Sequence, residues 1–350
     1  MVSIRLLSVP LAPPSGRKVN MQLNRSTLKA LVAALCAVAM TCFSGLSAAA
    51  DDYPSAPVTL IVPYPPGGSA DLIARLLGIG LTAQLKQTVV IKNVGGASGN
   101  IAGKTFKYAT PDGYTLILGN APLLAINPWL FTNPGFDPIK DFAPVTAVAD
   151  VPLFLITNPA APYKSVQEFV AWSKSHPDKA TYASGSSGST TNLAMKLFMK
   201  QAGFKSLEIP YKGSGPALSA LAANEVPVMF ELLPSAEGFI KGGMVNAIAV
   251  TSKTRQSTYP DIPTVAESGF PGFEVASWFG VLAPAGTSPA IIATLNKATT
   301  AAVADPQFKA HLIKLGAVPM QLGPQEFSVL IKDELQKWES IIKSSGVKIQ

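Results

Sequence analysis

The segment Val58-Thr-Leu-Ile-Val-Pro-Tyr64 is followed by Pro65-Pro-Gly-Gly-Ser69 and then by residues 71–85. The first segment is a short apolar run rich in β-branched residues, which predicts a buried strand. The proline and glycine pairs predict a turn, and the apolar residues of the third stretch recur at helical spacing. Within that stretch, Gly78 and Gly80 predict a face that packs closely against another element. The succession is strand, turn and helix.

The same alternation continues along the chain. A second strand is predicted at 88–92, a glycine-rich loop at 93–100, a helix that ends near residue 108 and a strand at 114–118. Strands that alternate with helices predict a parallel sheet covered by helices. The fold class is therefore α/β.

A second α/β unit begins at Ser165-Val-Gln-Glu168, which has the spacing of a capping box. The elements predicted after it are strand 180–183, helix 191–201, strand 207–211, helix 216–223, and strands 226–230 and 246–251. A strand at 277–282 follows, then two long helices, one that opens at Ser288-Pro289 and one at 325–344. These last helices suit packing against the first unit.

We therefore expect two lobes with a cleft between them. Residues 51–152 and 277–350 would form the first lobe, and residues 153–276 the second. The chain would cross between them near 151–157 and near 277–282. A chain of this length commonly divides into two domains.

The first fifty residues have the layout of a secretory signal peptide. After Met21 come Arg25 and Lys29, an apolar stretch at 31–40 and small residues that end at Ala50. We expect cleavage near residue 50, export to the periplasm and a true translation start at Met21. An uncleaved transmembrane anchor and a lipoprotein modified at Cys42 remain alternatives.

Charge and cysteine content change when this segment is set aside. The whole chain has a formal charge of +7 and a pI of about 9.3. Residues 1–50 hold five basic and no acidic residues, which leaves 23 basic against 21 acidic residues beyond them. This small surplus argues against nucleic acid as a partner. Both cysteines, Cys36 and Cys42, also lie in the segment, so the remainder has no disulfide framework or thiol nucleophile.

Motifs for catalysis and cofactors are weak. No G-x-S-x-G occurs, and Gly185-Ser-Ser-Gly188 has the wrong spacing. The two histidines, His176 and His311, are not close in sequence to a Gly-Ser turn, and no metal-binding histidine pair is present. We expect no enzymatic activity, metal or cofactor. A hydrolase that uses Ser186 or Ser187 remains the alternative.

Glycine and serine loops lie at three strand-to-helix junctions, at 65–71, 95–100 and 184–192. Such junctions gather at the carboxyl edge of a parallel sheet, where ligands bind. Each would place backbone N–H groups at a helix N-terminus, which favours an anion such as a carboxylate. Each loop by itself could equally be a tight turn with a serine cap.

Several of these segments together resemble one family. They are Val62-Pro-Tyr-Pro-Pro-Gly-Gly-Ser-Ala-Asp71, Gly95-Gly-Ala-Ser-Gly-Asn100, Tyr182-Ala-Ser-Gly-Ser-Ser-Gly188, Pro210-Tyr-Lys-Gly213, Asp261-Ile-Pro-Thr-Val-Ala-Glu-Ser-Gly269 and the stretch from Trp278 to Gly286. In this order, over residues 53–345, they resemble the periplasmic receptors of tripartite tricarboxylate transporters, the Bug family. The resemblance implies a type II periplasmic-binding-protein fold whose two lobes close on a small organic carboxylate.

The same resemblance implies partners and site residues. The partners would be a di-, tri- or aromatic carboxylate and the large and small membrane subunits of the transporter, which the receptor would meet as a monomer. A receptor that signals to a sensor kinase is a further alternative. The residues expected to bind the ligand are Tyr64, Pro66, Gly67, Gly68, Ser69, Asp71, Ser98, Asn120, Ser184, Ser186, Ser187, Ser189, Asn192, Tyr211, Lys212 and Glu231.

The chain departs from the family at several positions. Asn192 stands where the family often has His, Glu231 where it usually has Asp, and Asn224-Glu-Val-Pro227 where it usually has Gly-Gln-Val-Asp. These departures leave the fold assignment intact and make the ligand harder to name. Three aromatic residues could line an aromatic-acid pocket or simply belong to the core: Trp129, Phe230 and Trp278.

Overall fold

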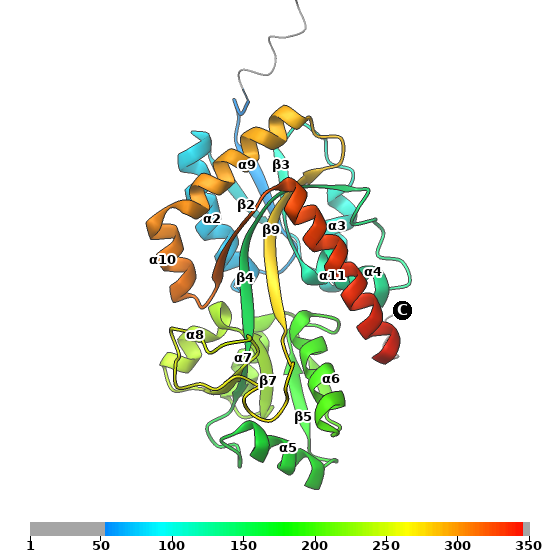
Figure 1. The fold of residues 1–350 in the computed structure, drawn as a ribbon, viewed down its shortest axis with the longest axis vertical. Coiled ribbons are helices and arrows are strands. Elements are labelled where there is room, and N and C mark those ends of the chain that lie inside the picture. Colours follow the sequence, from blue (N-terminus) through cyan, green and yellow to red (C-terminus); the bar gives the residue numbers. More distant parts are fainter. Residues whose placement is uncertain (1–52, 346–350) are drawn as a thin grey trace, which may run out of the picture. The chain divides into compact units, whose positions relative to one another are not determined.

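The computed structural model describes residues 53–345, which belong to one compact unit; the expected signal peptide lies outside them. Its largest sheet has the strand order β10-β4-β9-β3-β1-β2 (Figure 1). The strands are β1 (Val58–Val62), β2 (Val89–Asn93), β3 (Thr115–Asn120), β4 (Phe142–Thr157), β9 (Ala276–Pro284) and β10 (Val318–Leu322). The three strands predicted at 58–64, 88–92 and 114–118 are thus confirmed.

The sheet is mixed, and the expectation of a parallel sheet is right only for part of it. Strands β1, β2 and β3 are parallel, whereas β9 is antiparallel to β3 and to β4, and β10 is antiparallel to β4. Parallel neighbours need a crossover connection such as a helix. Strand β9 instead enters the sheet from a long non-helical segment and runs against its neighbours.

Strand β4 takes part in two sets of strand pairs. Its residues from Phe142 to Pro152 pair with β9, and those from Leu153 to Thr157 pair with β7 (Val228–Leu232) and β8 (Asn246–Val250). Figure 1 shows β4 and β9 side by side, with β4 continuing to β7. We call the part around β1, β2, β3, β9 and β10 the first lobe and the part around β5 to β8 the second lobe. The residue boundaries of the lobes stay a prediction.

The second lobe alternates helices and strands. Its other elements are α5 (Val166–Ser175), β5 (Thr181–Ser184), α6 (Thr190–Ala202), β6 (Leu207–Pro210), α7 (Ser214–Ala222) and α8 (Leu233–Lys241). Strands β5 and β6 form a parallel pair. The Ser165 hydroxyl accepts a hydrogen bond from the Glu168 amide at 3.2 Å, which confirms the predicted cap of α5. The Glu168 carboxylate accepts its bond from the Lys164 amide, one residue before the capping serine.

Helices cover the first lobe. They are α2 (Ser69–Leu85), α3 (Asn100–Phe106), α4 (Asn127–Leu130), α9 (Pro289–Ala304), α10 (Pro306–Lys314) and α11 (Pro324–Ser345), with the single turns η1 (Ala97–Gly99) and η2 (Pro122–Ile126). The predicted close-packing face of α2 is confirmed, because a Cβ on Gly80 would lie 2.9 Å from the Ala302 Cβ of α9. Burial of Ile73, Leu77 and Leu81, one helix turn apart, fixes α2 against β1.

The elements that were not predicted include α4, β4, α8, α10 and β10. Helix α8 begins directly after β7 with Leu233-Pro234, so no turn residues mark the boundary. Helix α10 is separated from α9 by Asp305, whose carboxylate accepts the amides of Gln307 and Phe308. Asp305 was not recognised as a capping residue from the sequence, because it lies inside a longer helical pattern.

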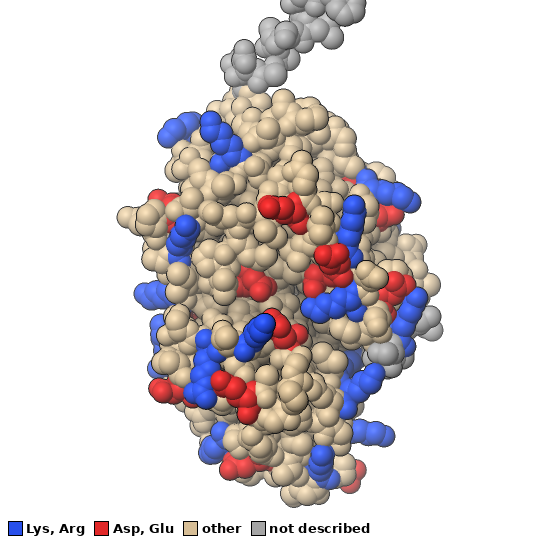
Figure 2. Space-filling view, viewed as in Figure 1, with Lys and Arg blue, Asp and Glu red and all other residues tan. Residues whose placement is uncertain are grey.

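Charges of both signs are interspersed on the face drawn in Figure 2, without a field of one sign. The pattern agrees with the near balance of basic and acidic residues beyond residue 50. Within residues 53–345, no helix combines the length and the apolar character needed to cross a membrane.

Candidate functional site

A cavity of about 300 Å³ lies between the two lobes. Its first-lobe wall comes from the β1–α2 loop, the end of β3 and strand β9; its second-lobe wall comes from the β5–α6 loop, the start of α7 and the end of β7. The lining residues are Tyr64, Pro65, Pro66, Gly68, Ser69, Ala70, Asn120, Pro122, Gly185, Ser186, Ser189, Thr190, Thr191, Lys212, Gly213, Ser214, Gly215, Pro216, Glu231, Leu232, Ser277 and Phe279.

Asp71 braces the β1–α2 loop from inside the first lobe. Its carboxylate accepts hydrogen bonds from the Gly67 amide at 3.0 Å, the Asn93 side-chain amide at 3.0 Å and the Arg75 guanidinium at 2.9 Å. Burial raises the pKa of Asp71, but the bonds from Arg75, Gly67 and Asn93 outweigh burial and hold this pKa below its ordinary value. Gly67 has φ of +84°, which favours glycine in this turn. Asp71 therefore shapes the loop and does not line the cavity.

The N-terminus of α2 faces the cavity without a cap. Gly68 occupies the capping position and has no side chain to satisfy the first amides of the helix. Gly68, Ser69 and Ala70 all line the cavity. The positive end of the helix dipole therefore lies at this space, and no side chain caps the first amides there, as an anion site requires.

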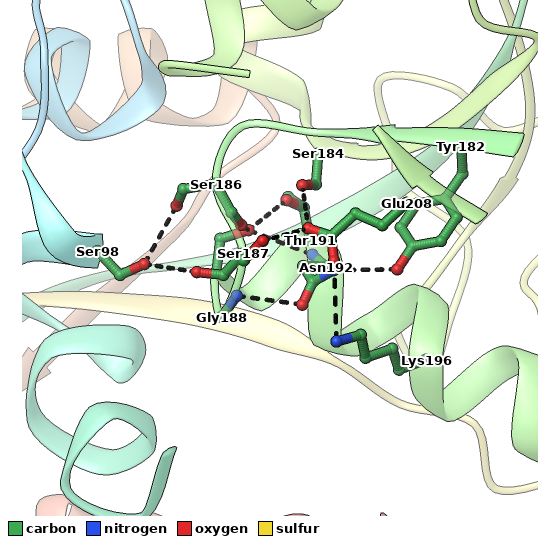
Figure 3. A network of polar contacts seen from close by, with 11 residues as sticks. Ser98, Tyr182, Ser184, Ser186, Ser187, Gly188, Thr191, Asn192, Lys196 and Glu208 are labelled. Atoms are coloured by element: carbon green, nitrogen blue, oxygen red, sulfur yellow. Dashed lines mark hydrogen bonds and ion pairs between the residues drawn. The ribbon is translucent and has the colours of Figure 1, made fainter. Parts of the chain in front are cut away.

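Glu208 of β6 braces the loop between β5 and α6. Its Oε1 atom accepts hydrogen bonds from Ser184 at 2.7 Å and Ser187 at 2.9 Å, and Lys196 lies 3.8 Å from Oε2 (Figure 3). Sequence reasoning assigned both serines to the ligand and missed Glu208. Neither serine lines the cavity, because both hydroxyls are directed to this carboxylate.

The helix that follows this loop is already capped. The Ser189 hydroxyl accepts the Asn192 amide at 3.2 Å, and the Asn192 Oδ1 atom accepts the Gly188 amide at 3.1 Å. The Asn192 Nδ2 atom donates to the Tyr182 hydroxyl at 3.0 Å (Figure 3). Asn192 is thus a fully buried support of the loop, and α6 offers a ligand fewer free amides than α2 does.

The second uncapped helix at the cavity is α7, which sequence reasoning started two residues too late. Gly213 occupies its capping position, with φ of +110° and no side-chain hydrogen bond. Gly213, Ser214 and Gly215 line the cavity, and a Cβ on Gly185 would lie 3.3 Å from the Ser214 amide nitrogen. The sequence signal for this helix start was Gly213-Ser-Gly-Pro216 after β6, a glycine-serine run like those at the three junctions identified from the sequence.

Lys212 supplies a positive charge at the same place. Its side chain is exposed, lines the cavity and has no ion-pair partner among the residues that the structure describes. Tyr211, by contrast, does not line the cavity and donates its backbone amide to the Ser184 carbonyl.

The two lobes are joined by hydroxyl contacts at the cavity. The Ser98 hydroxyl donates to the Ser187 carbonyl at 2.7 Å and lies 3.2 Å from the Ser186 hydroxyl (Figure 3). On another side, the hydroxyls of Ser69 and Ser235 lie 2.7 Å apart. The structure therefore has the lobes in contact. The loop 95–100 contributes Ser98 to this contact and no residue to the cavity lining.

Tyr64 and Asn120 form a polar pair in the first-lobe wall, with the Tyr64 hydroxyl 3.2 Å from the Asn120 Nδ2 atom. Burial raises the pKa of Tyr64 above its ordinary value, so this hydroxyl is neutral. None of the three aromatic residues considered from the sequence lines the cavity: Phe230 stacks with Phe273, and Trp278 packs edge-on against Phe327.

Glu231 is the buried carboxyl group of the cavity. Its side chain is 1% exposed; one oxygen accepts the Leu232 amide at 2.8 Å, and Oε2 has no hydrogen-bond partner within the described part of the chain. Burial raises the pKa of Glu231 to about 7, against the opposing effects of the Leu232 amide and the Ser214 hydroxyl. Nearby, Pro227 precedes β7, and its carbonyl accepts the Asn158 amide, so the missing N–H leaves the strand intact.

The sixteen residues expected at the ligand fall into two groups. Those that line the cavity are Tyr64, Pro66, Gly68, Ser69, Asn120, Ser186, Ser189, Lys212 and Glu231. Those that do not line the cavity are Gly67, Asp71, Ser98, Ser184, Ser187, Asn192 and Tyr211.

The histidines do not complete a hydrolase site with the loop serines. The His176 ring stacks on Trp172, and its Nδ1 atom lies 3.1 Å from the Trp172 carbonyl oxygen. The His311 Nδ1 atom lies 2.7 Å from the Gln307 carbonyl oxygen. Within the described part of the chain, no group of three metal-binding side chains is found.

Comparison with known proteins agrees with this geometry. The family model described as "Tripartite tricarboxylate transporter family receptor" matches residues 73–347. Protein BugT of Bordetella pertussis is 36% identical over 302 residues, covering 86% of this chain and 93% of BugT. The structure is similar to an R. palustris protein solved with adipate, with a TM-score of 0.83 at 35% identity, covering 85% of this chain and 99% of that one.

Two further solved structures are similar. Periplasmic binding protein BugD has a TM-score of 0.81 at 35% identity, covering 85% of this chain and 100% of BugD. MatC from Rhodopseudomonas palustris with bound malate has a TM-score of 0.79 at 32% identity, covering 83% of this chain and 100% of MatC. The chain therefore belongs to the receptor family of the tripartite tricarboxylate transporters, the Bug family.

Proposed function

We propose that the protein is a non-catalytic periplasmic receptor that captures a small organic dicarboxylate and delivers it to the two membrane subunits of its transporter. The observation that carries the proposal is the pair of uncapped helix N-termini, α2 and α7, at one cavity between the lobes. Free amides at helix N-termini bind carboxylates by hydrogen bonds and by the helix dipole. Lys212 adds a positive charge.

The size of the cavity supports a small ligand. A volume of about 300 Å³ lies at the lower end of the range for ligand pockets. Two similar proteins were solved with adipate and with malate, which are both small dicarboxylates. In our proposal, one carboxylate of the ligand binds the amides of Ser69 and Ala70, and the second-lobe residues close on the rest of the molecule.

The contacts between the lobes support closure as the binding step. Ser98 and Ser69 contact the second lobe, and β4 continues from its pairing with β9 into its pairing with β7 and β8. A ligand that contacts both lobes would stabilise this closed form over an open one.

A binding screen tests the proposal. The protein is purified from the periplasmic fraction, and its melting temperature is measured with adipate, malate, longer dicarboxylates and aromatic acids. A ligand at about 100 times its Kd stabilises a folded protein by about 2.7 kcal/mol, which gives a clear shift. Failure of every acid to shift the melting temperature or to release calorimetric heat would contradict the proposal. Labelling of Ser186 or Ser187 by a fluorophosphonate probe would contradict the non-catalytic role.

A further inference from the structure

Glu231 is the one feature of the cavity that a carboxylate receptor does not obviously need. It lies at the end of β7, between the starts of α7 and α8, and its side chain is almost completely buried. Its Oε2 atom has no hydrogen-bond partner among the residues that the structure describes, while Oε1 accepts the Leu232 amide. A buried polar atom without a partner is costly, so the site is expected to supply one when it is filled.

Within residues 53–345, no lysine or arginine forms an ion pair with this carboxyl group. The titratable side chains on the elements packed against β7 are Asp150 of β4, Tyr182 of β5, Lys196 and Lys200 of α6, and Glu237 and Lys241 of α8, with Tyr64 and Lys212 in the cavity wall. None of these charges affects the pKa of Glu231, which burial raises to about 7 against the Leu232 amide and the Ser214 hydroxyl. Lys196 pairs with Glu208, and Lys241 pairs with Glu237.

We propose that Glu231 meets the ligand as the neutral acid, with the proton on Oε2 donated in a hydrogen bond to a carboxylate oxygen of the ligand. The inference rests on the proposed function, since it needs an anionic ligand. An ionised Glu231, almost completely buried at the cavity wall, would repel that anion, whereas the neutral acid pairs its orphan oxygen and attracts it. Binding therefore takes up one proton from solvent wherever the empty receptor has lost it.

The proton balance sets the direction of the pH dependence. Below pH 7 the empty receptor already holds the proton, and affinity does not change with pH. Above pH 7 each binding event must take up a proton, so affinity falls by about tenfold per pH unit until the liganded acid itself ionises. The same arrangement should also affect ligand specificity. A neutral Glu231 that donates its proton favours ligands with a hydrogen-bond acceptor at this position over ligands with an ammonium group there.

Calorimetry on the purified full receptor tests the inference, with adipate and malate as the probes. Titrations at pH 6 and pH 8, each in two buffers of different ionisation enthalpy, give the number of protons taken up. We expect nearly none at pH 6 and close to one at pH 8. Glu231→Gln keeps a donor in place, so its affinity at pH 6 should lie within about threefold of wild type and should change little by pH 8, without proton uptake.

The matched control is Glu237→Gln, which removes a carboxylate of α8 outside the cavity and should behave as wild type. Binding to wild type without proton uptake at pH 8 overturns this inference and leaves the receptor function in place. Affinity that rises with pH, or that Glu231→Gln abolishes at pH 6, also overturns it, since the carboxylate would then be needed in its charged form. The absence of binding by any acid overturns the proposed function itself.

Discussion

The loops that begin the two lobes' ligand walls are built on the same plan and end differently. In the first lobe, Asp71 braces the β1–α2 loop, and in the second lobe Glu208 braces the β5–α6 loop. After the first loop, α2 starts at Gly68 without a side-chain cap, whereas α6 starts at Ser189 with one. The second lobe presents its free helix end at Gly213 of α7 instead.

The residue at the capping position decides whether a glycine-serine loop can offer free amides to an anion. A hydroxyl at the capping position satisfies the first amides of its own helix, so those amides are no longer free for a ligand. A glycine at that position leaves them unsatisfied. A missing cap at a cavity is therefore a better sign of an anion site than the number of serines in the loop.

Removal of the first-lobe brace should have the largest effect. Asp71→Ala takes away the acceptor of the Gly67 amide and the Asn93 side chain. We expect the free energy of unfolding to fall by about 2–3 kcal/mol and dicarboxylate affinity to fall by at least about a hundredfold. Urea unfolding and calorimetry measure the two effects. Unchanged affinity in Asp71→Ala would show that the loop keeps its shape without the brace.

Asp71 should also make folding stability depend on pH. This stability falls as pH is lowered, whereas the ligand affinity that depends on Glu231 falls as pH is raised. Its pKa is held below the ordinary value of 3.8 in the folded protein, so its stabilising effect is present above that value. That stability is lost as pH falls through the lower folded-state pKa. Acid unfolding of Asp71→Asn should begin from a lower plateau and change less with pH than that of wild type.

A side-chain cap introduced at the start of α2 should make this helix N-terminus resemble the capped start of α6. Gly68 has φ of −86°, and a Cβ there would have only the Ser214 Oγ atom within 4 Å, at 3.9 Å. Asp at position 68 can therefore cap α2 without strain and compete with the ligand's carboxylate. We expect Gly68→Asp to weaken dicarboxylate binding by about thirtyfold or more, roughly 2 kcal/mol, with stability changed by only a few tenths of a kcal/mol. Gly68→Ser, which caps without charge, should lie between it and wild type.

Loss of the existing cap of α6 should have the opposite pattern. Ser189→Ala leaves the Asn192 amide unsatisfied and should lower the free energy of unfolding by about 1 kcal/mol. Dicarboxylate affinity should change by less than about threefold, because α6 does not supply the free amides. If Ser189→Ala weakened binding more than Gly68→Asp did, the assignment of the anion site to α2 would be reversed.

The smallest effect concerns the strand that the lobes share. Burial, followed by the nearby carboxylate of Glu334, raises the pKa of Asp150 on β4 to about 6. A raised folded-state pKa gives stability that is present below the ordinary value of 3.8 and is lost as pH rises through about 6. Asp150→Asn should therefore raise the melting temperature by about 2 °C at pH 8 and by less at pH 5. A lower melting temperature in the variant at pH 8 would contradict this.

How far the sequence predicts the molecule depends on the range of the interaction. The strands 58–64, 88–92 and 114–118 and the cap at Ser165 follow from local patterns, and the structure has them. The antiparallel course of β9 depends on how distant segments pair. So does the brace at Glu208, since it reaches Ser184 only because β5 and β6 lie side by side.

The site shows the same limit. The sequence indicates which loops carry polar groups, and nine of the residues expected at the ligand do line the cavity. It does not indicate whether a hydroxyl faces the ligand or a carboxylate of the protein, which separates Ser186 from Ser187 although they are adjacent. The start of α7 was available in the sequence, because Gly213-Ser-Gly-Pro216 repeats the pattern of the other loops.

We propose that the amides at the start of α2 bind the ligand's carboxylate, and a crystal structure of the receptor with its dicarboxylate would test this binding mode. We expect one carboxylate oxygen within about 3 Å of the amide nitrogen of Ser69 or Ala70, inside the cavity between the lobes. A ligand carboxylate held instead by the loop 95–100, or by the capped start of α6 alone, would contradict it.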